Sequence, residues 1–389
     1  METVAPVQQG ERAIIVDIVR GFALTGVLFA NITAYSDQNM PAAMLAAMSS
    51  PLDDFLATFA KLFIEWKFMT IFSILFGYGF GLILASLEKK NINPAPFFAR
   101  RMLWLFVFGI IHALMWWGDV LHFYALTGLI LFACRKLKTP QLLTASILFM
   151  FIIPPVISFL FRDHTSFFND DNMKTLYTHY KFGNLGDVLV YNLQLNYRAF
   201  VLTGLDVHDI CLTLGRFFFG YYLLRIGLFD GIENKKSLFR KFMFIGAPVT
   251  ITYMIFRWYT LKPDFSMNQF ILEPLLGIGI FSTACFYVCT LVWLYLHQGS
   301  TWVFRALQAL GKMTLSNYLL VSVASITLFY GIGFGKLGET PMRIVWIFAC
   351  CCLFVEVVFS TYWLNRFQYG PMEWVWRQLT YNKRIRLKK

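Results

Sequence analysis

The chain has 389 residues, of which 58% are hydrophobic, 18% aromatic and only 14% charged. A soluble domain carries about 25% charged residues, so this composition excludes a soluble enzyme, a disordered chain and a disulfide-rich secreted scaffold. It predicts an all-α, polytopic membrane protein. We attribute the net charge of +12 to basic cytoplasmic loops and expect no nucleic-acid partner.

Ten apolar segments are long enough to predict transmembrane helices, because a helix rises ~1.5 Å per residue through a hydrocarbon core ~30 Å thick. In chain order they cover about 14–35, 68–87, 102–117, 120–134, 141–161, 209–227, 242–257, 270–296, 313–330 and 344–365. A further helix over 52–67 leads into the second span. The third and fourth spans form a tight hairpin around Gly118 and Asp119, and Gly77 and Gly81 form a small-residue face for a close helix contact.

The loop charges predict the orientation of these helices. With the N-terminus inside, 22 of the 34 Lys and Arg residues fall on inner segments and eight on outer ones, so both termini are predicted to be cytoplasmic. The simplest organisation is one membrane domain over 1–389. It consists of a five-helix half at 14–161, an external loop at 162–208 whose later part packs on the membrane face, and a second five-helix half at 209–389.

Polar residues inside the first span lie on one helical face. Asp17 and Arg20 are three residues apart and can form an ion pair. Asn31 follows Arg20 by eleven residues, about three turns, and therefore sits on the same face ~16 Å further out. This stripe has two interpretations: a set of bonds that holds the bundle together, or the wall of a cavity.

The third span has the same spacing. Arg100 and Arg101 lie at its cytoplasmic end, and His112 lies eleven residues after Arg101, in the outer half. A histidine can carry a proton near neutral pH, and a carboxylate can orient it. Asp119 is two turns from His112, too far for contact in a straight helix, although the turn at Gly118 could fold it back. A structural hydrogen bond is the alternative role for His112.

Other intramembrane polar groups are interpreted one by one as packing ion pairs. They are Glu65, Lys67, Arg216, Glu273 and Glu356. Two proline-containing sites, Pro154-Pro155 and Glu273-Pro274, are places where a span could break. The seven cysteines are interpreted as small apolar packing residues, and neither a disulfide nor a metal site is predicted.

Six ordered motifs run along nearly the whole chain. They are Asp17-x-x-Arg20-Gly21 with Asn31, the run 67–77, Arg100-Arg101 leading to 109–112, Gly118-Asp119 with Tyr124, the run 311–318 and the run 370–377. In these motifs the chain resembles the YeiB family of bacterial multi-pass membrane proteins, which is defined by a C-terminal domain of unknown function. The resemblance implies a location in the bacterial plasma (inner) membrane. The outer loop fits this family poorly.

More remotely, the first span resembles that of integral-membrane acyltransferases. In those proteins an Arg-Gly pair is followed, ten residues after the Gly, by a His or Asn near the reaction centre. Gly21 and Asn31 keep this spacing. Because Asn31 stands where one branch has its catalytic histidine, the resemblance implies that another residue supplies the base, and His112 is our choice.

The leading hypothesis is transfer of an acyl group from a cytoplasmic acyl-CoA co-substrate to a small-molecule or lipid acceptor at the outer face, with no covalently bound cofactor. The Arg100–Arg101 pair, with Arg20 and Asp17 beside it, is predicted to hold the CoA phosphates. The catalytic roles are His112 as general base, Asp119 as its orienting carboxylate and Asn31 as donor to the oxyanion.

Two alternatives from other classes stay open. One is a transporter or channel for a small solute or a lipid, and the other is a non-catalytic membrane scaffold. Besides the lipid bilayer, a second copy of the chain is a candidate partner, because Phe-rich helix faces suit packing against either lipid or another subunit.

Overall fold

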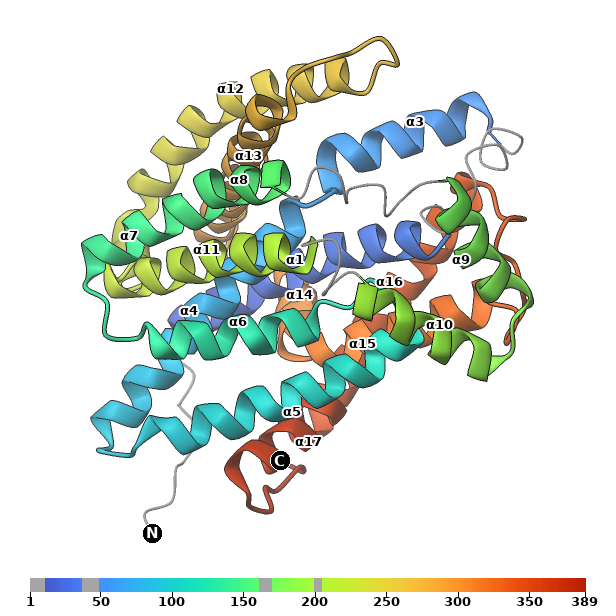
Figure 1. Ribbon diagram of the computed structural model, residues 1–389. Helices are drawn as coiled ribbons and strands as arrows, with labels where there is room; N and C mark the ends of the chain where they lie inside the picture. Colours follow the sequence, from blue (N-terminus) through green and yellow to red (C-terminus); the bar gives the residue numbers. More distant parts are fainter. Residues whose placement is uncertain (1–10, 37–48, 161–169, 199–204) are drawn as a thin grey trace.

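The computed structural model describes residues 11–36, 49–160, 170–198 and 205–389, and within these ranges it contains helices and no β-strand (Figure 1). The first half consists of α1 (Glu11–Ser36), α3 (Pro51–Phe59), the π-helix η1 (Ala60–Ile64), α4 (Lys67–Lys89), α5 (Pro94–Met115), α6 (Leu121–Ala133), α7 (Thr139–Ile147), the π-helix η2 (Leu148–Ile152) and α8 (Ile153–Leu160). The second half consists of α9 (Asp170–Phe182), α10 (Leu185–Arg198), α11 (Leu205–Arg225), the 3₁₀ turn η5 (Ile232–Lys235), α12 (Lys236–Thr260), α13 (Gln269–Gln298), α14 (Trp302–Lys312), α15 (Thr314–Phe329), α16 (Met342–Arg366) and α17 (Pro371–Tyr381). The all-α prediction is therefore confirmed.

Helices long and apolar enough to cross a membrane are fewer than the ten predicted spans. Seven helical stretches in the described ranges meet that standard, and an eighth is added if α14 and α15, which meet at an angle of 83°, count as one span. The remaining two predicted spans are α6, with 13 residues, and α11, with 21. All ten predicted segments are helical, and the multi-pass membrane class holds, whereas the count of ten stays a prediction.

Breaks in the helices do not fall where the prolines predicted them. The stretch from Thr139 to Leu160 continues through Pro154-Pro155, and α13 continues through Pro274. Interruptions occur instead between α14 and α15, which meet at 83°, and between η1 and α4, where Trp66 adopts the left-handed conformation with φ 65°. A non-glycine residue in that region is strained, so the surrounding packing must hold it.

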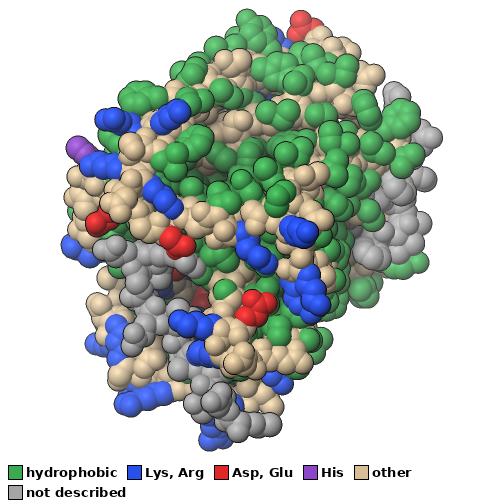
Figure 2. Space-filling view, turned by 90° about the vertical axis from the view of Figure 1, so that its left-hand side faces the viewer, with side chains coloured by type: hydrophobic (Ala, Val, Ile, Leu, Met, Phe, Trp, Pro, Cys, Tyr) green, Lys and Arg blue, Asp and Glu red, His purple; other side chains and the backbone are tan. Residues whose placement is uncertain are grey.

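Positive charge gathers at one end of the bundle. This end carries the turns from α4 to α5, from α6 to α7 and from α11 to α12 (Figure 1). Seen end-on, its surface shows many Lys and Arg side chains and few Asp or Glu (Figure 2). This is the distribution that the positive-inside rule gives a cytoplasmic face. The cytoplasmic position of the termini remains a prediction.

Glycines allow two pairs of helices to approach closely. A Cβ added to Gly21 of α1 would lie 1.8 Å from the Leu307 carbonyl oxygen of α14, and one added to Gly311 of α14 would lie 1.8 Å from the Asp17 carbonyl oxygen. Likewise a Cβ on Gly77 of α4 would lie 2.1 Å from the Phe217 carbonyl oxygen of α11. The predicted small-residue face of α4 is therefore confirmed, with α11 as its partner.

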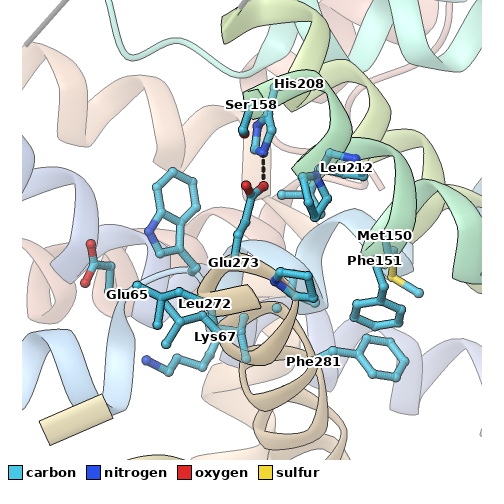
Figure 3. Close-up of a pocket in the computed structure, with 18 of the residues that line it drawn as sticks. Glu65, Lys67, Met150, Phe151, Ser158, His208, Leu212, Leu272, Glu273 and Phe281 are labelled. Carbon is cyan, nitrogen blue, oxygen red and sulfur yellow. Dashed lines mark hydrogen bonds and ion pairs between the residues drawn. The ribbon is translucent and has the colours of Figure 1, made fainter. Parts of the chain in front are cut away.

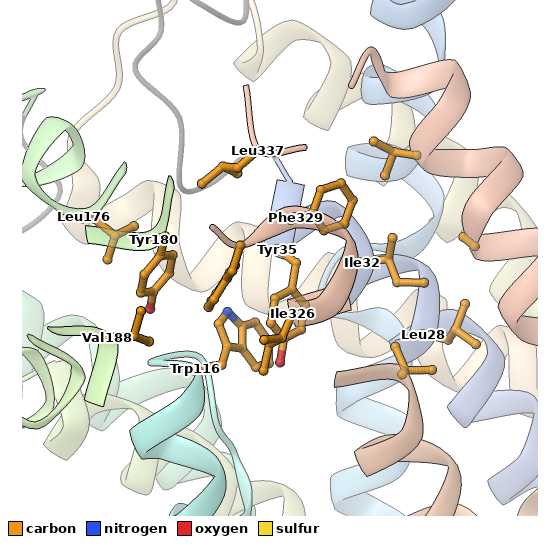
Figure 4. Packing of buried hydrophobic residues seen from close by; sticks show 14 of the residues in the cluster. Leu28, Ile32, Tyr35, Trp116, Leu176, Tyr180, Val188, Ile326, Phe329 and Leu337 are labelled. Carbon is orange, nitrogen blue, oxygen red and sulfur yellow. The ribbon is translucent and has the colours of Figure 1, made fainter. Parts of the chain in front are cut away.

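The opposite end of the bundle is closed by α9 and α10, from the predicted outer loop. Tyr180 and Tyr191 are buried there. Asn192 of α10 links α9 to α5, because it accepts a hydrogen bond from Tyr180 Oη at 2.6 Å and donates one to the Leu114 carbonyl of α5 at 2.9 Å. Figure 4 shows Tyr180 as part of an apolar cluster that also contains Tyr35 of α1 and Trp116, whose rings stack with 4.1 Å between their centroids. Residues 162–169 and 199–204 of the loop lie outside the described ranges.

Candidate functional site

The turn between α5 and α6 brings His112 and Asp119 together. The helix α5 ends at Met115, the backbone becomes extended at Trp116, and Asp119 folds back over the last turn of α5. His112 Nδ1 then lies 2.7 Å from Asp119 Oδ1, although the two residues are two helical turns apart in sequence. The side chains are 4% and 0% exposed respectively, so water does not screen this contact.

Asp119 is held by a second histidine as well. Its other oxygen, Oδ2, accepts hydrogen bonds from His122 Nδ1 at 2.7 Å and from the His122 backbone N–H at 3.0 Å. An ionised carboxylate can only accept, so each histidine donates from Nδ1. In neutral His112 the proton is therefore on Nδ1, and Nε2, on the opposite side of the ring from Asp119, is available as an acceptor.

The group on the far side of His112 is Ser322 of α15, which the sequence reasoning did not single out. Ser322 Oγ lies 2.7 Å from His112 Nε2 and is within 3.0 Å of the Tyr318 carbonyl oxygen, one turn earlier. The Ser322 hydroxyl has one proton, which it can donate either to the Tyr318 carbonyl oxygen or to His112 Nε2, because Nε2 carries no proton in this tautomer. A serine, a histidine and a carboxylate thus form one continuous hydrogen-bonded chain, the arrangement that activates a hydroxyl as a nucleophile.

Aromatic rings enclose this chain, which we call the histidine cluster: His112, Asp119, His122 and Ser322. The Trp116 ring meets the His112 ring edge-on at 5.9 Å, and the Tyr318 ring lies 4.9 Å away. Asn31 is half-buried on α1, one turn before the Tyr35 ring that stacks on Trp116. Within the described part of the chain, no hydrogen bond joins Asn31 to the cluster.

The predicted phosphate-binding residues lie away from the histidine cluster: Arg100 and Arg101 are near the start of α5, and Asp17 and Arg20 are in the first half of α1. Arg20 Nη1 donates to Asp17 Oδ1 at 2.8 Å, which confirms the predicted ion pair, and also to the Gly311 carbonyl oxygen at 3.3 Å. Arg101 interacts electrostatically with Arg20 and Arg377, and Asp17 interacts with Arg20, Lys312 and Arg377. Three cations therefore interact with the Asp17 carboxylate, and Arg101 interacts with two of those three. We call these four residues the basic cluster: Arg20, Arg101, Lys312 and Arg377.

Arg100 and Arg101 both contact the C-terminal helix α17, in different ways. Arg100 Nε donates to the Thr380 carbonyl oxygen at 3.1 Å and its side chain is exposed, whereas Arg101 stacks on the Trp376 ring at 3.8 Å. Arg101 thus belongs to the basic cluster, and Arg100 mainly anchors α17. The same helix binds α15 through the Glu373 carboxylate, which accepts hydrogen bonds from the Leu315 and Ser316 N–H groups at 2.6 and 3.0 Å.

A second polar region, a cavity of about 450 Å³, lies between α4, α8, α11, α12 and α13 (Figure 3). Four residues that the sequence treated as separate ion pairs line it: Glu65, Lys67, Arg216 and Glu273. Within the described ranges only two of them form an ion pair: Glu273 Oε1 lies 2.6 Å from His208 Nε2, and Glu65 Oε2 lies 3.4 Å from Arg257 Nη2. In the sequence, the only feature that could have grouped these four residues is that the predicted topology places them toward the outer ends of their spans.

Comparisons with known proteins give a family without a described activity. A family model described as "Protein of unknown function (DUF418)" matches residues 223–383. The uncharacterized protein YxaH of Bacillus subtilis (strain 168) is 31% identical, over 98% of this chain and 97% of its own, and the uncharacterized protein YeiB of Escherichia coli (strain K12) is 26% identical, over 95% and 96%. No solved structure matches the chain. With a relative of this identity along almost its whole length, and with the sequence motifs described above, the chain belongs to the YeiB (DUF418) family of multi-pass membrane proteins.

Proposed function

We propose that the protein is an integral-membrane acyltransferase, which takes an acyl group from acyl-CoA at the cytoplasmic side and passes it to a hydroxyl or amine at the outer face of the bacterial plasma membrane. The observation that supports this most is the chain from Ser322 through His112 to Asp119, with both heavy-atom distances at 2.7 Å. A general base within hydrogen-bond reach of a hydroxyl, and itself oriented by a carboxylate, is the geometry that acyl transfer needs.

The chemistry proceeds in two steps. Ser322 Oγ bonds to the thioester carbonyl carbon while its proton passes to His112 Nε2; the C–S bond then breaks, and the CoA thiolate leaves with that proton. An acceptor hydroxyl or amine next attacks the acyl-serine, its proton passes to His112 Nε2, and the Ser322 oxygen leaves and takes that proton back. Asp119 stabilises the imidazolium in both steps, and Asn31 is our proposed donor to the oxyanion.

The basic cluster supports a phosphate-bearing donor. Clustered guanidinium groups bind phosphates well, and here Arg20 and Arg377 interact electrostatically with both Asp17 and Arg101, while Lys312 also interacts with Asp17. Arg101 precedes His112 by eleven residues on α5, a rise of ~16 Å. An elongated donor held by its phosphates at the cytoplasmic end can therefore extend its thioester toward the histidine cluster. Because Ser322 is 2% exposed, the surrounding helices must separate to admit it.

The decisive experiment replaces His112 with glutamine. Glutamine keeps much of the size and one hydrogen bond but cannot accept a proton near neutral pH. A general base contributes about 10²–10⁴-fold to rate, so we expect His112→Gln to fold and bind donor yet turn over a radiolabelled acyl-CoA at least ~100-fold more slowly in proteoliposomes. Ser322→Ala should be equally slow and should lose any acyl-serine adduct in the intact mass. Turnover near the native rate in His112→Gln would contradict the proposal.

The donor end has its own test, with adjacent arginines as a matched pair. Arg101→Ala combined with Arg377→Ala should weaken acyl-CoA binding by about 10-fold or more, and the loss should shrink in high salt. Arg100→Ala, one residue away, should bind as the native protein does, because Arg100 is exposed and contacts α17. Thermal-shift titration with acyl-CoA measures both. An equal loss in both variants would remove the basic cluster from the donor site.

Transport of a small anionic solute or lipid is a second candidate, favoured by one observation. The helix from Pro51 to Lys89 is broken at Trp66, and the break borders the cavity. Discontinuous helices at a central cavity are characteristic of secondary transporters. Flux of a labelled solute across proteoliposomes that lack acyl-CoA would favour this function over acyl transfer.

A further inference from the structure

The cavity between α4, α8, α11, α12 and α13 is bordered by several irregularities of the backbone. Lys61 belongs to the π-helix η1, Trp66 has the left-handed conformation, and Met150 and Phe151 belong to the π-helix η2. Pro154, Pro155 and Pro274 line it as well. π-Helical turns occur preferentially at functional sites, and irregular backbone at membrane depth occurs where it lines a cavity.

Acidic side chains around this cavity already have partners. His208 Nε2 lies 2.6 Å from Glu273 Oε1 (Figure 3), and its Nδ1 lies 3.0 Å from Asp209 Oδ1. Glu65 pairs with Arg257 at 3.4 Å. These contacts engage all three carboxylates, so none of them is free to bind a cation in the cavity.

The basic side chains are less well satisfied. Arg216 of α11 is 6% exposed and lines the cavity. Among the described residues its guanidinium has neither a hydrogen bond nor an ion pair. It interacts electrostatically with Asp209, but the Asp209 carboxylate is already bound by His208. Lys67 is 1% exposed, and its Nζ donates to the Lys61 carbonyl oxygen at 2.8 Å. A buried cation without a counterion is costly, so this site is suited to an anion.

Neutral donors face the same space. The hydroxyl groups of Thr70 and Tyr253 are buried and have no hydrogen-bond partner among the described residues, and both residues line the cavity. Lys67 and Thr70 also lie in the first turn of α4, which begins at the break with no side-chain cap. The positive end of the helix dipole therefore adds to the attraction for an anion.

The remaining walls are apolar. Met150, Phe151, Leu212, Leu276 and Phe281 supply large apolar side chains, and the volume of about 450 Å³ falls in the range of pockets that hold drug-sized molecules. A fully hydrated inorganic ion would leave these walls without contacts. The occupant that matches both parts has one anionic head and an apolar tail.

We propose that this cavity binds an amphiphilic anion, a carboxylate or phosphate monoester on an apolar tail, with its head at Arg216 and Lys67 and its tail against η2 and α13. This inference does not rest on acyl transfer, because it concerns equilibrium binding at a separate site. A free fatty acid and the head of a single-chain lipid phosphate share this chemistry.

The test is isothermal titration of the purified full-length protein, in an uncharged maltoside detergent, with octanoate, octyl phosphate, octanol and inorganic phosphate. At least one of the two amphiphilic anions should bind, and the tighter one identifies the natural head group. Octanol and inorganic phosphate, which each lack one half of the ligand, should bind at least ~10-fold more weakly. Octanol that binds as tightly as the anions, or phosphate that does, would overturn the proposal.

Two variants localise the binding. Arg216→Gln should weaken binding about 10- to 100-fold, as expected for one charge-assisted contact, and Arg216→Lys should retain part of it. The matched control is Arg225→Gln, at the cytoplasmic end of the same helix, where the arginine is exposed and bonds to Tyr221 Oη. Native affinity in Arg216→Gln would overturn the assignment of the head group.

The apolar part is tested by filling it. A Cβ added to Gly277 meets nothing closer than 3.6 Å, at Phe151, so Gly277→Leu can extend into the cavity without a backbone clash. It should abolish binding of the eight-carbon anions. Gly79→Leu adds the same bulk where a new Cβ has open space and lies outside the cavity, and it should bind as the native protein does. Equal binding by both leucine variants would place the tail elsewhere.

Discussion

The bundle holds two polar regions that differ in how far their groups are satisfied. In the histidine cluster, Asp119 accepts three hydrogen bonds and His112 is bonded at both ring nitrogens. In the cavity, and among the described residues, Arg216 has neither a hydrogen bond nor an ion pair, and the hydroxyls of Thr70 and Tyr253 have no hydrogen-bond partner. One region is complete without a ligand, and the other is not.

This difference indicates what each region can do. A satisfied network fixes tautomers and distances, so it suits a preorganised chemical group. Unsatisfied groups around an open volume cost stability that a bound molecule can restore, so they suit recognition. The same polar residues would serve neither role if they were scattered singly over the helices.

Removing Asp119 should have the largest effect on stability. Asp119→Ala leaves two imidazole N–H groups and one backbone N–H without their acceptor inside the bundle, so we expect a loss of about 3–5 kcal/mol in the free energy of unfolding. Ser322→Ala, which removes a single hydroxyl, should cost only about 1 kcal/mol. Denaturation in detergent followed by tryptophan fluorescence measures both. If both losses are alike, the cluster is not a cooperative network.

The opposite outcome is expected in the cavity. Arg216→Met replaces an unpaired buried guanidinium by an apolar side chain of similar length, so the free energy of unfolding should stay within about 1 kcal/mol of the native value or rise. The thermal midpoint without added ligand decides this. A fall as large as that of Asp119→Ala would show that Arg216 belongs to a satisfied network, and the contrast between the two regions would be lost.

Much of the fold, and half of the histidine cluster, followed from the sequence. Long apolar runs predict helices because the bilayer offers no hydrogen-bond partner to backbone N–H and C=O groups. The predicted hairpin at Gly118 also placed Asp119 near the end of α5. Ser322 could not be found in this way, because it meets His112 across 210 residues through the packing of α15. The π-helical turns and the left-handed Trp66 carry no strong local signal, so the cavity they border was invisible as well.

Glu356 of α16 sharpens the comparison with a smaller expected effect. It is buried, and neither carboxylate oxygen has a hydrogen-bond partner in the described part of the chain, but it does not line the cavity. Glu356→Gln should therefore change stability by no more than about 1 kcal/mol and leave octanoate and octyl phosphate binding unchanged. The same titration and melting curve test it. Weakened binding would show that an unpaired carboxyl group outside the cavity also matters for recognition.

The smallest effect is expected at an exposed ion pair outside both regions. Glu339, between α15 and α16, lies 2.9 Å from Lys181 Nζ of α9 and 2.9 Å from Lys336 Nζ, and these two ammonium groups lower the pKa of Glu339 to about 2. A lowered carboxyl pKa stabilises the folded state above the unfolded pKa of about 4.3, and this contribution is lost as the pH falls through about 2. Because solvent screens the pair, the loss should loosen only the contact between residues 331–341 and α9. Amide hydrogen exchange of 331–341, corrected for intrinsic rates, should therefore hold steady from about pH 7 to pH 5 and rise below that range, whereas Glu339→Gln should lack this pH-dependent rise. The same rise in the glutamine variant would assign the pH response to a different group.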